Sequence, residues 1–270
     1  MAGMSLQYKL IDTGGIGKVY RVTDRETNRT WAEKIINYSK FNDRELAEEI
    51  FDHEVNMMQE VLGVASAVQF HEAEKYRGGA SIRMEYLSGT SLDRYLADPE
   101  KLQSEKLQIL GQTGLIINEL HDRGIIHADI KPGNFFVTDH SLKIFDFGYG
   151  RSPKNPWKFN LKPPTVEYCS PEQARKEEID EHSDEFSYAV MIYAFITNKF
   201  HFGSRPQVTR EMIQTRARNY CSGRAFISQQ SLVKDLSEYS EELADVIGPL
   251  LSPEPAERTI NPLIEYLLCQ

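Results

Sequence analysis

Two short stretches decide the fold of this chain: HADIKPGN at residues 127–134 and DFG at residues 146–148. Besides His127, their polar side chains are two carboxylates, one ammonium and one amide: Asp129, Lys131, Asn134 and Asp146. Carboxylate and amide oxygens are the ligands that Mg²⁺ prefers, and an ammonium stabilises phosphate charge. Between the stretches, apolar runs at residues 135–137 and 142–144 predict a β-hairpin.

Together the two stretches resemble the catalytic loop and the metal-binding triplet of eukaryotic-type serine/threonine protein kinases. The resemblance implies that Asp129 is the catalytic base for a substrate hydroxyl, and that Lys131 stabilises charge on the transferred γ-phosphate. Asn134 and Asp146 are then the Mg²⁺ ligands, so ATP and Mg²⁺ are the implied cofactors. A single Asp is more often a cap or turn residue, but this joint occurrence is specific.

The composition is that of an ordinary water-soluble protein of 270 residues, with 40% hydrophobic and 26% charged residues. No run of 18 apolar residues predicts a membrane span, and the N-terminus lacks a secretory signal. Three scattered cysteines favour a reduced, cytoplasmic location. A cellular protein, a viral protein and a bacterial protein that acts inside a host cell all stay open. A net charge of −9 disfavours nucleic-acid binding.

The pattern changes from strands to helices along the chain. Four short strands are predicted around one helix at 42–62, at residues 8–11, 18–22, 30–36 and 81–86. Helices are predicted after Leu92, at 102–121 and 187–195. The resemblance implies the same α+β arrangement, a bilobal kinase fold with ATP between the lobes. A small antiparallel-sheet N-lobe (about 1–86), a connector (about 85–91) and a mostly helical C-lobe (about 92–270) then form one kinase domain over 1–270.

A glycine-rich turn, GGIGKV at residues 14–19, lies between two predicted strands. Glycine lets backbone N–H groups approach phosphate oxygens, so the resemblance assigns Gly14, Gly15 and Gly17 to ATP. Asp12 replaces the first glycine of the family pattern GxGxxGxV, and a bare turn is the alternative reading.

Lys34 and Glu54 are predicted to form an ion pair. Lys34 follows Val19 by 34 − 19 = 15 residues, which returns one strand beside the other. An Asn42–Glu45 capping box starts the helix, whose apolar stripe contains Leu46, Ile50, Met57, Met58 and Val61. Glu54 falls on this stripe and therefore needs a buried partner. A solvent-facing lysine is the alternative for Lys34.

By resemblance, one set of residues surrounds the adenine and ribose of ATP. Met84 lies behind the adenine, and the backbone of Glu85 and Leu87 binds it. The full predicted set comprises Ile11, Val19, Ala32, Met84, Glu85, Leu87, Ser91 and Phe136. Core packing is the alternative for its apolar members.

Residues of the second half complete the resemblance. Lys131 followed by proline implies serine/threonine substrates, and Thr165 is the threonine that contacts the catalytic Asp and Lys. Glu172 is expected to pair with Arg258, and Asp184 to anchor the catalytic loop.

The chain departs from the family at Ala128, where an Arg usually binds a phosphate on the activation segment. We therefore expect an activity that does not depend on such a phosphate. Autophosphorylation is expected as well. Residues 148–165 contain four basic residues and no acid: Arg151, Lys154, Lys158 and Lys162. They indicate acidic or already phosphorylated protein substrates, or simply a solvated loop.

Two other readings fit the sequence less well. A catalytically dead scaffold would have lost the lysine, the base or a metal ligand, and none is lost. A small-molecule phosphotransferase of the aminoglycoside or choline type would lack the Lys-Pro pattern, the Ser-Pro-Glu motif and the matching Arg258. Atypical acceptors stay open, and nothing indicates the physiological substrate or the oligomeric state.

Overall fold

The computed structural model describes residues 6–13, 17–159, 165–200, 203–204 and 229–270. The chain separates into two compact units, one of residues 1–89 and 138–148 and the other of residues 90–137 and 149–270. Gly14, Gly15 and Lys162 lie outside the described residues.

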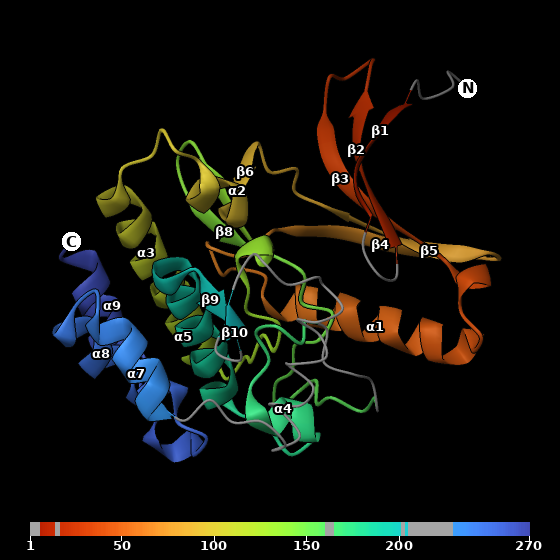
Figure 1. Ribbon diagram of the computed structural model, residues 1–270. Coiled ribbons are helices and arrows are strands. Elements are labelled where there is room, and N and C mark those ends of the chain that lie inside the picture. Colours follow the sequence, from red (N-terminus) through yellow and green to blue (C-terminus); the bar gives the residue numbers. More distant parts are fainter. Residues whose placement is uncertain (1–5, 14–16, 160–164, 201–202, 205–228) are drawn as a thin grey trace. The chain divides into compact units, whose positions relative to one another are not determined.

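The first unit is built on a five-stranded antiparallel sheet in the order β1-β2-β3-β5-β4 (Figure 1). Its strands are β1 (Leu6–Thr13), β2 (Gly17–Asp24), β3 (Thr30–Asn37), β4 (Phe70–Tyr76) and β5 (Gly79–Met84). The first three predicted strands lie within β1, β2 and β3, and the fourth begins two residues earlier and ends at Met84. β4 is missing from the prediction because it is polar, and only Phe70 and Ala73 are even partly buried along it.

Helix α1 (Arg44–Glu60) covers one face of this sheet, reached through the 3₁₀ helix η1 (Tyr38–Lys40). The core between them contains residues of β3, η1, α1, β5 and the segment before β4: Ile36, Tyr38, Ala47, Phe51, Met58, Val68, Ala80 and Ile82. The predicted cap at Asn42 is wrong by one residue. Asp43 is the N-cap, and its carboxylate accepts a hydrogen bond of 3.1 Å from the Leu46 N–H. Asn and Asp cap equally well, so sequence alone does not separate neighbours of these types.

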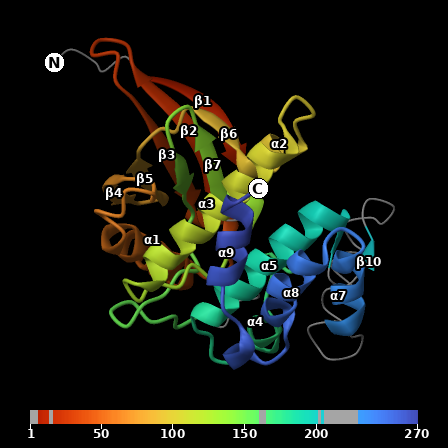
Figure 2. The same ribbon diagram turned by 90° about the vertical axis from the view of Figure 1, so that its left-hand side faces the viewer.

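Helix α5 (Glu181–Thr197) is the core of the second unit, and 13 of its 17 residues are buried. Helices α3 (Gln103–His121) and α9 (Asn261–Leu268) pack against each other beside it (Figure 2). Gly114 permits this packing, because a Cβ there would lie 2.5 Å from Cγ1 of Ile264. The predicted helices at 102–121 and 187–195 are thus confirmed, the second as part of a longer helix.

The other elements of the second unit are short. They are α2 (Leu92–Ala97), η2 (Pro132–Asn134), α4 (Pro171–Arg175), β9 (Lys199–Phe200), β10 (Gly203–Ser204), α7 (Gln229–Ser237), α8 (Glu241–Ile247), η3 (Pro249–Leu251) and η4 (Pro255–Glu257). Strands β6 (Gly89–Ser91), β7 (Phe135–Thr138) and β8 (Leu142–Ile144) lie near the points where the chain passes between the units. The turn of the predicted hairpin is present, since the Thr138 N–H donates to the Ser141 carbonyl at 2.9 Å.

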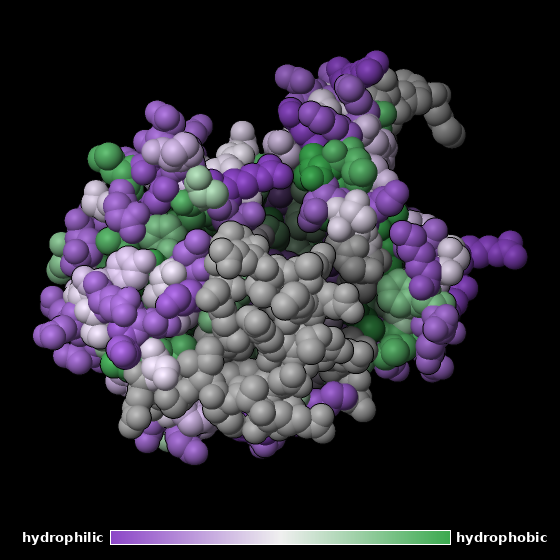
Figure 3. All heavy atoms as spheres, viewed as in Figure 1, coloured by the Kyte–Doolittle hydropathy of each residue, from purple (hydrophilic) through white to green (hydrophobic). Residues whose placement is uncertain are grey.

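Hydrophilic residues dominate the described surface in the view of Figure 3, and the hydrophobic patches there are small and separate. Scattered apolar residues are normal on protein surfaces. Among the described residues, no helix is both long and apolar enough to cross a membrane.

Candidate active site

Lys34 and Glu54 form a buried ion pair in the first unit. Lys34 lies on β3 opposite Val19 of β2, and Glu54 lies on the sheet-facing side of α1. The Lys34 Nζ is 2.5 Å from Oε1 of Glu54, and the two side chains are 11% and 2% exposed. Lys34, the predicted partner of Glu54, is therefore the residue that pairs with this buried carboxylate.

The electrostatics of this pair keep Lys34 charged. Burial by itself lowers the pKa of Lys34, but the carboxylates of Glu54 and Asp146 outweigh it and raise that pKa above its usual value. Burial also raises the pKa of Glu54, and the charge of Lys34 opposes this shift. Oε2 of Glu54 is buried and has no hydrogen-bond partner among the described residues. The ammonium is thus essential to the ionised form of Glu54.

Asp146 belongs to the same unit and lies near this pair, with its Oδ1 3.6 Å from the Lys34 Nζ. Its backbone is left-handed, with φ of 66°, and the next residue, Phe147, is fully buried. A non-glycine residue in this conformation costs about 1–3 kcal/mol, and such strain clusters at functional sites. The Asp146 side chain is 44% exposed, so its carboxylate is accessible to a cation.

The residues predicted to surround ATP fall in both units. Val19, Ala32 and Met84 lie on adjacent strands, with Ala32 paired to Met84. Ile11 is exposed on β1, and Glu85 and Leu87 follow β5. The Glu85 N–H donates to the Gln69 carbonyl at 2.8 Å, which holds the start of this segment. The second unit contains the other two, Ser91 at the N-cap of α2 and Phe136 on β7.

Gly17 has a structural role that the glycine-rich pattern did not indicate. It is the first residue of β2, and a Cβ there would lie 2.8 Å from the Ile35 carbonyl oxygen. The close approach of β2 to β3 therefore requires a residue without a side chain. Gly17 stays a predicted phosphate contact as well.

Asp129 is the centre of a hydrogen-bonded group in the second unit. Its Oδ2 accepts from the Lys131 Nζ at 2.7 Å, and its Oδ1 accepts from the Thr165 hydroxyl at 2.8 Å. The Lys131 ammonium also donates to the Thr165 hydroxyl at 2.7 Å. Asp129 is only 6% exposed, so these contacts fix the direction in which its carboxylate points.

Asn134 completes this group. Its amide nitrogen donates to the Asp129 carbonyl at 2.8 Å and to the Asp129 carboxylate at 2.9 Å. This use of the NH₂ group leaves the amide oxygen as the atom available to a cation. Asp129, Lys131 and Asn134 of the first quoted stretch are therefore joined by hydrogen bonds, and their catalytic and metal-binding roles stay predictions.

Asp184 holds the backbone that leads into Asp129. Its carboxylate accepts from the N–H groups of His127 at 2.7 Å and Ala128 at 2.8 Å. It also contacts Nε2 of His121 at 3.1 Å. Burial by itself raises the pKa of Asp184, but the hydrogen bond and charge of His121 and the backbone N–H of His127 outweigh it and lower that pKa. The expected anchoring contacts are thus present.

His121 is a residue that the sequence reasoning missed. It ends α3 and is mostly buried against Asp184. Burial lowers the pKa of His121, but the hydrogen bond and charge of Asp184 outweigh it and raise that pKa above its usual value. The only sequence signal was its position in the last turn of a helix, a few residues before the first quoted stretch. A histidine at the end of a helix is also explained by the helix dipole, so this position did not indicate a contact with Asp184.

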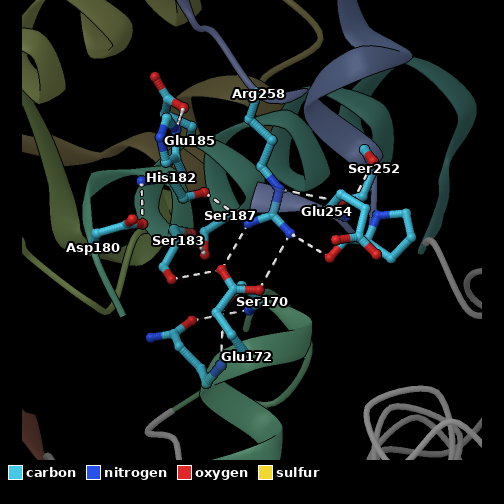
Figure 4. Close-up of polar contacts among 12 residues, drawn as sticks. Ser170, Glu172, Asp180, His182, Ser183, Glu185, Ser187, Ser252, Glu254 and Arg258 are labelled. Atoms are coloured by element: carbon cyan, nitrogen blue, oxygen red, sulfur yellow. Dashed lines mark hydrogen bonds and ion pairs between the residues drawn. The ribbon is translucent and has the colours of Figure 1, made fainter. Parts of the chain in front are cut away.

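Glu172 and Arg258 form another buried ion pair, shown in Figure 4. The Arg258 guanidinium donates to both carboxylate oxygens of Glu172, at 2.7 and 3.2 Å. The Ser183 hydroxyl donates to the same carboxylate at 2.6 Å. Burial by itself raises the pKa of Glu172, but the hydrogen bonds and charge of Arg258 outweigh it and lower that pKa. This pair connects α4 to the segment before α9.

Comparisons with known proteins agree with this geometry. The chain matches the protein kinase domain family over residues 6–265. It is 30% identical to rat myosin light chain kinase 3 over 197 residues, 71% of this chain and 24% of that protein. It is 28% identical to serine/threonine-protein kinase PknA of Mycobacterium tuberculosis, over 78% of this chain and 51% of PknA. A probable serine/threonine-protein kinase of Clostridium acetobutylicum is also 28% identical, over 76% of this chain and 32% of that protein. The chain therefore spans about a quarter to a half of the length of these relatives.

Proposed function

Since this chain belongs to the protein kinase domain family, we propose that it transfers the γ-phosphoryl group of ATP to serine and threonine hydroxyls of protein substrates. The observation that carries the proposal is the Asp129 carboxylate, held by Lys131, Thr165 and Asn134 at 2.7 to 2.9 Å. A buried carboxylate with a fixed direction is suited to orient one hydroxyl.

In the proposed reaction, the substrate oxygen forms a bond to the γ-phosphorus while the bond from that phosphorus to the bridging oxygen of ADP breaks. The bonding electrons leave with ADP. Asp129 accepts the proton of the hydroxyl, a role that typically contributes about 10²–10⁴-fold in rate. Lys131 donates to the oxygens of the transferred group and stabilises their charge.

Mg²⁺ would be held by Asn134 and Asp146, whose oxygens suit a hard cation. The fit rests on the amide oxygen that Asn134 leaves available and on the accessible carboxylate of Asp146. Bound Mg²⁺ supplies positive charge to the phosphates. In the first unit, Lys34 is the cation for the α- and β-phosphates, and Glu54 is a positioning residue that holds its ammonium.

The proposal extends to regulation. Ala128 offers only a methyl group where the family has a phosphate-binding Arg. We therefore expect that phosphatase treatment leaves transfer activity within about twofold, and that autophosphorylation occurs without being required. A loss of activity of tenfold or more on dephosphorylation, reversed on incubation with ATP, would contradict this part.

Two exposed lysines support the proposal that the chain prefers acidic or already phosphorylated substrates. Lys154 and Lys158 are exposed, whereas Arg151 packs over the Trp157 ring and is largely buried. This burial lowers the pKa of Arg151 to about 10, so Arg151 is still a cation at neutral pH but is less exposed than the two lysines. A Lys154→Glu/Lys158→Glu variant should lose preference for peptides with acidic flanks. Equal rates of wild type and variant on such peptides would end this proposal.

Location and partners stay predictions from composition. The scattered cysteines favour a reduced, cytoplasmic location, and the net charge of −9 disfavours nucleic acid as a partner.

The test of the proposed function is transfer from γ-labelled ATP with Mg²⁺ to a panel of acceptors. The panel contains mixed proteins, matched Ser, Thr and Tyr peptides, an aminoglycoside and choline. Label in Ser and Thr peptides, and its loss in a Lys34→Met variant, is the expected result. Label only in a small molecule would favour a small-molecule phosphotransferase, and ATP binding without transfer would favour a scaffold.

A further inference from the structure

Gln173 joins two parts of the second unit through both ends of its carboxamide. Its Oε1 accepts from the Ser170 N–H at 2.9 Å, as part of a capping box at the start of α4. Its Nε2 donates to the Ala128 carbonyl at 2.8 Å, 45 residues earlier in the chain. Figure 4 shows the turn at Ser170 where α4 begins, beside Glu172.

The backbone that Gln173 contacts is strained. Ala128 is 4% exposed and left-handed, with φ of 62°, although it is not glycine. Such a residue costs about 1–3 kcal/mol and persists only where its surroundings hold it. Its N–H is held by Asp184, and its carbonyl is held by Gln173.

The Ala128 carbonyl belongs to the peptide group whose nitrogen is that of Asp129. That nitrogen donates to Nδ1 of His127 at 3.2 Å. Gln173 and His127 therefore hold the two ends of one planar peptide, and the orientation of this plane sets where the Asp129 side chain starts. A change of the plane would move the carboxylate relative to Lys131.

The segment that carries Gln173 also contacts Asp129 directly. Thr165 donates to the Asp129 carboxylate, and the Thr165 carbonyl accepts from the N–H groups of Tyr168 and Cys169, both at 3.2 Å. This turn leads into Ser170. One short segment, residues 165–173, thus holds Asp129 at its carboxylate through Thr165 and at its backbone through Gln173.

We propose that Gln173 is a positioning residue that fixes the peptide before Asp129 from the segment that carries Thr165. This inference rests on the proposed function and deepens it, because it names a connection between that segment and the predicted base that needs no phosphate. The connection runs through a backbone carbonyl, so the methyl side chain of Ala128 does not prevent it.

The test compares two variants that separate the cap from the connection. In Gln173→Glu, a carboxylate oxygen still accepts from the Ser170 N–H, but the ionised group cannot donate to the Ala128 carbonyl. In Gln173→Met, both contacts are lost. Gln112→Met, at an exposed position of α3, is the control. Each chain is assayed for kcat and KM with ATP and a serine peptide from pH 6 to pH 8, and its unfolding temperature is measured.

We expect both Gln173 variants to have a kcat about 10- to 100-fold below wild type, because small misplacements of catalytic groups have effects of this size. The KM for ATP should stay within twofold. The deficit of Gln173→Glu should persist from pH 6 to pH 8, because a glutamate with the usual pKa of about 4.3 stays ionised over this range and cannot donate. A kcat within twofold of wild type for either variant would overturn the proposal. In particular, a Gln173→Glu variant with wild-type kcat beside an impaired Gln173→Met variant with a lower unfolding temperature would indicate a cap only.

Amide hydrogen exchange gives a readout that does not need transfer activity. The N–H groups of His127, Ala128 and Asp129 are all hydrogen-bonded and should exchange slowly in wild type. Exchange in residues 127–129 should rise about tenfold or more in Gln173→Met and stay unchanged in Gln112→Met. If wild type transfers no phosphate, the proposed function fails, yet unchanged exchange in Gln173→Met would separately overturn the connection.

Discussion

Replacing Glu172 by Gln should strongly destabilise the second unit. The guanidinium of Arg258 is fully buried, and Glu172 is the acid that balances it, with two hydrogen bonds at 2.7 and 3.2 Å. The other donors of Arg258 are directed to backbone carbonyls, which carry no net charge. The Gln variant therefore leaves a buried charge without a counterion, which costs about 3–5 kcal/mol. The total free energy of unfolding of a typical protein is about 5–15 kcal/mol, so this loss is a large part of it.

The assay is urea and thermal unfolding, with Glu178→Gln at an exposed position as the matched control. A loss of this size should lower the unfolding temperature by about 6–20 °C, at about 2–4 °C for each kcal/mol. Adding Arg258→Met should recover part of the loss, because the unpaired charge is removed. A Glu172→Gln loss below about 1 kcal/mol, or strictly additive effects of the two substitutions, would refute the reasoning.

The same pair predicts a pH dependence. The pKa of Glu172 is lowered in the folded chain, so its contribution is present above the pKa of an unfolded glutamate, about 4.3. It is lost as the pH falls through the folded-state pKa. The difference between wild type and Glu172→Gln should therefore shrink in acid, and a difference that is constant below pH 4 would contradict the ion pair.

Three further substitutions test other parts of the structure. His121→Gln keeps a donor toward Asp184 but does not titrate. Because the pKa of His121 is raised in the folded chain, its contribution to the free energy of unfolding is complete below about pH 6.5 and is lost above the folded-state pKa. The stability advantage of wild type over this variant should therefore fall from pH 6 to pH 9, and a constant difference would contradict the contact. Gly114→Ala should cost about 1–3 kcal/mol by overpacking against Ile264, measured by urea unfolding, and an unchanged midpoint would show that α9 shifts without cost. Lys34→Met should weaken ATP binding measured by calorimetry, and unchanged affinity and transfer would remove this lysine from the site.

The elements of the fold that were predictable from the sequence are those in which apolar side chains recur at the spacing of a helix or a strand. The apolar stripe of α1 identified Glu54 as buried and in need of a partner. Lys34 was the candidate for that partner, and the structure shows this ion pair. The expected α+β kinase fold is confirmed by the five-stranded antiparallel sheet, the helical second unit and the family match over residues 6–265. The pairing of Glu172 with Arg258 is also present as expected.

What the sequence did not indicate depends on tertiary contacts. Strand β4 is polar on both faces, so no alternation of apolar residues marks it. The left-handed backbone of Ala128 has no local signal, because alanine has no preference for that conformation. The contacts of His121 with Asp184 and of Gln173 with the Ala128 carbonyl join residues 63 and 45 positions apart. Common residue types at such separations form no pattern that a single sequence can show.

The central claim is that Asp129 is the base for phosphoryl transfer, and Asp129→Asn tests it most directly. The measurement is kcat and KM with ATP, Mg²⁺ and a serine peptide, with Asp245→Asn at an exposed position of α8 as the control. The account predicts a kcat lower by about 10²–10⁴-fold, with the KM for ATP within threefold of wild type. A variant that keeps kcat within about threefold of wild type would contradict the account.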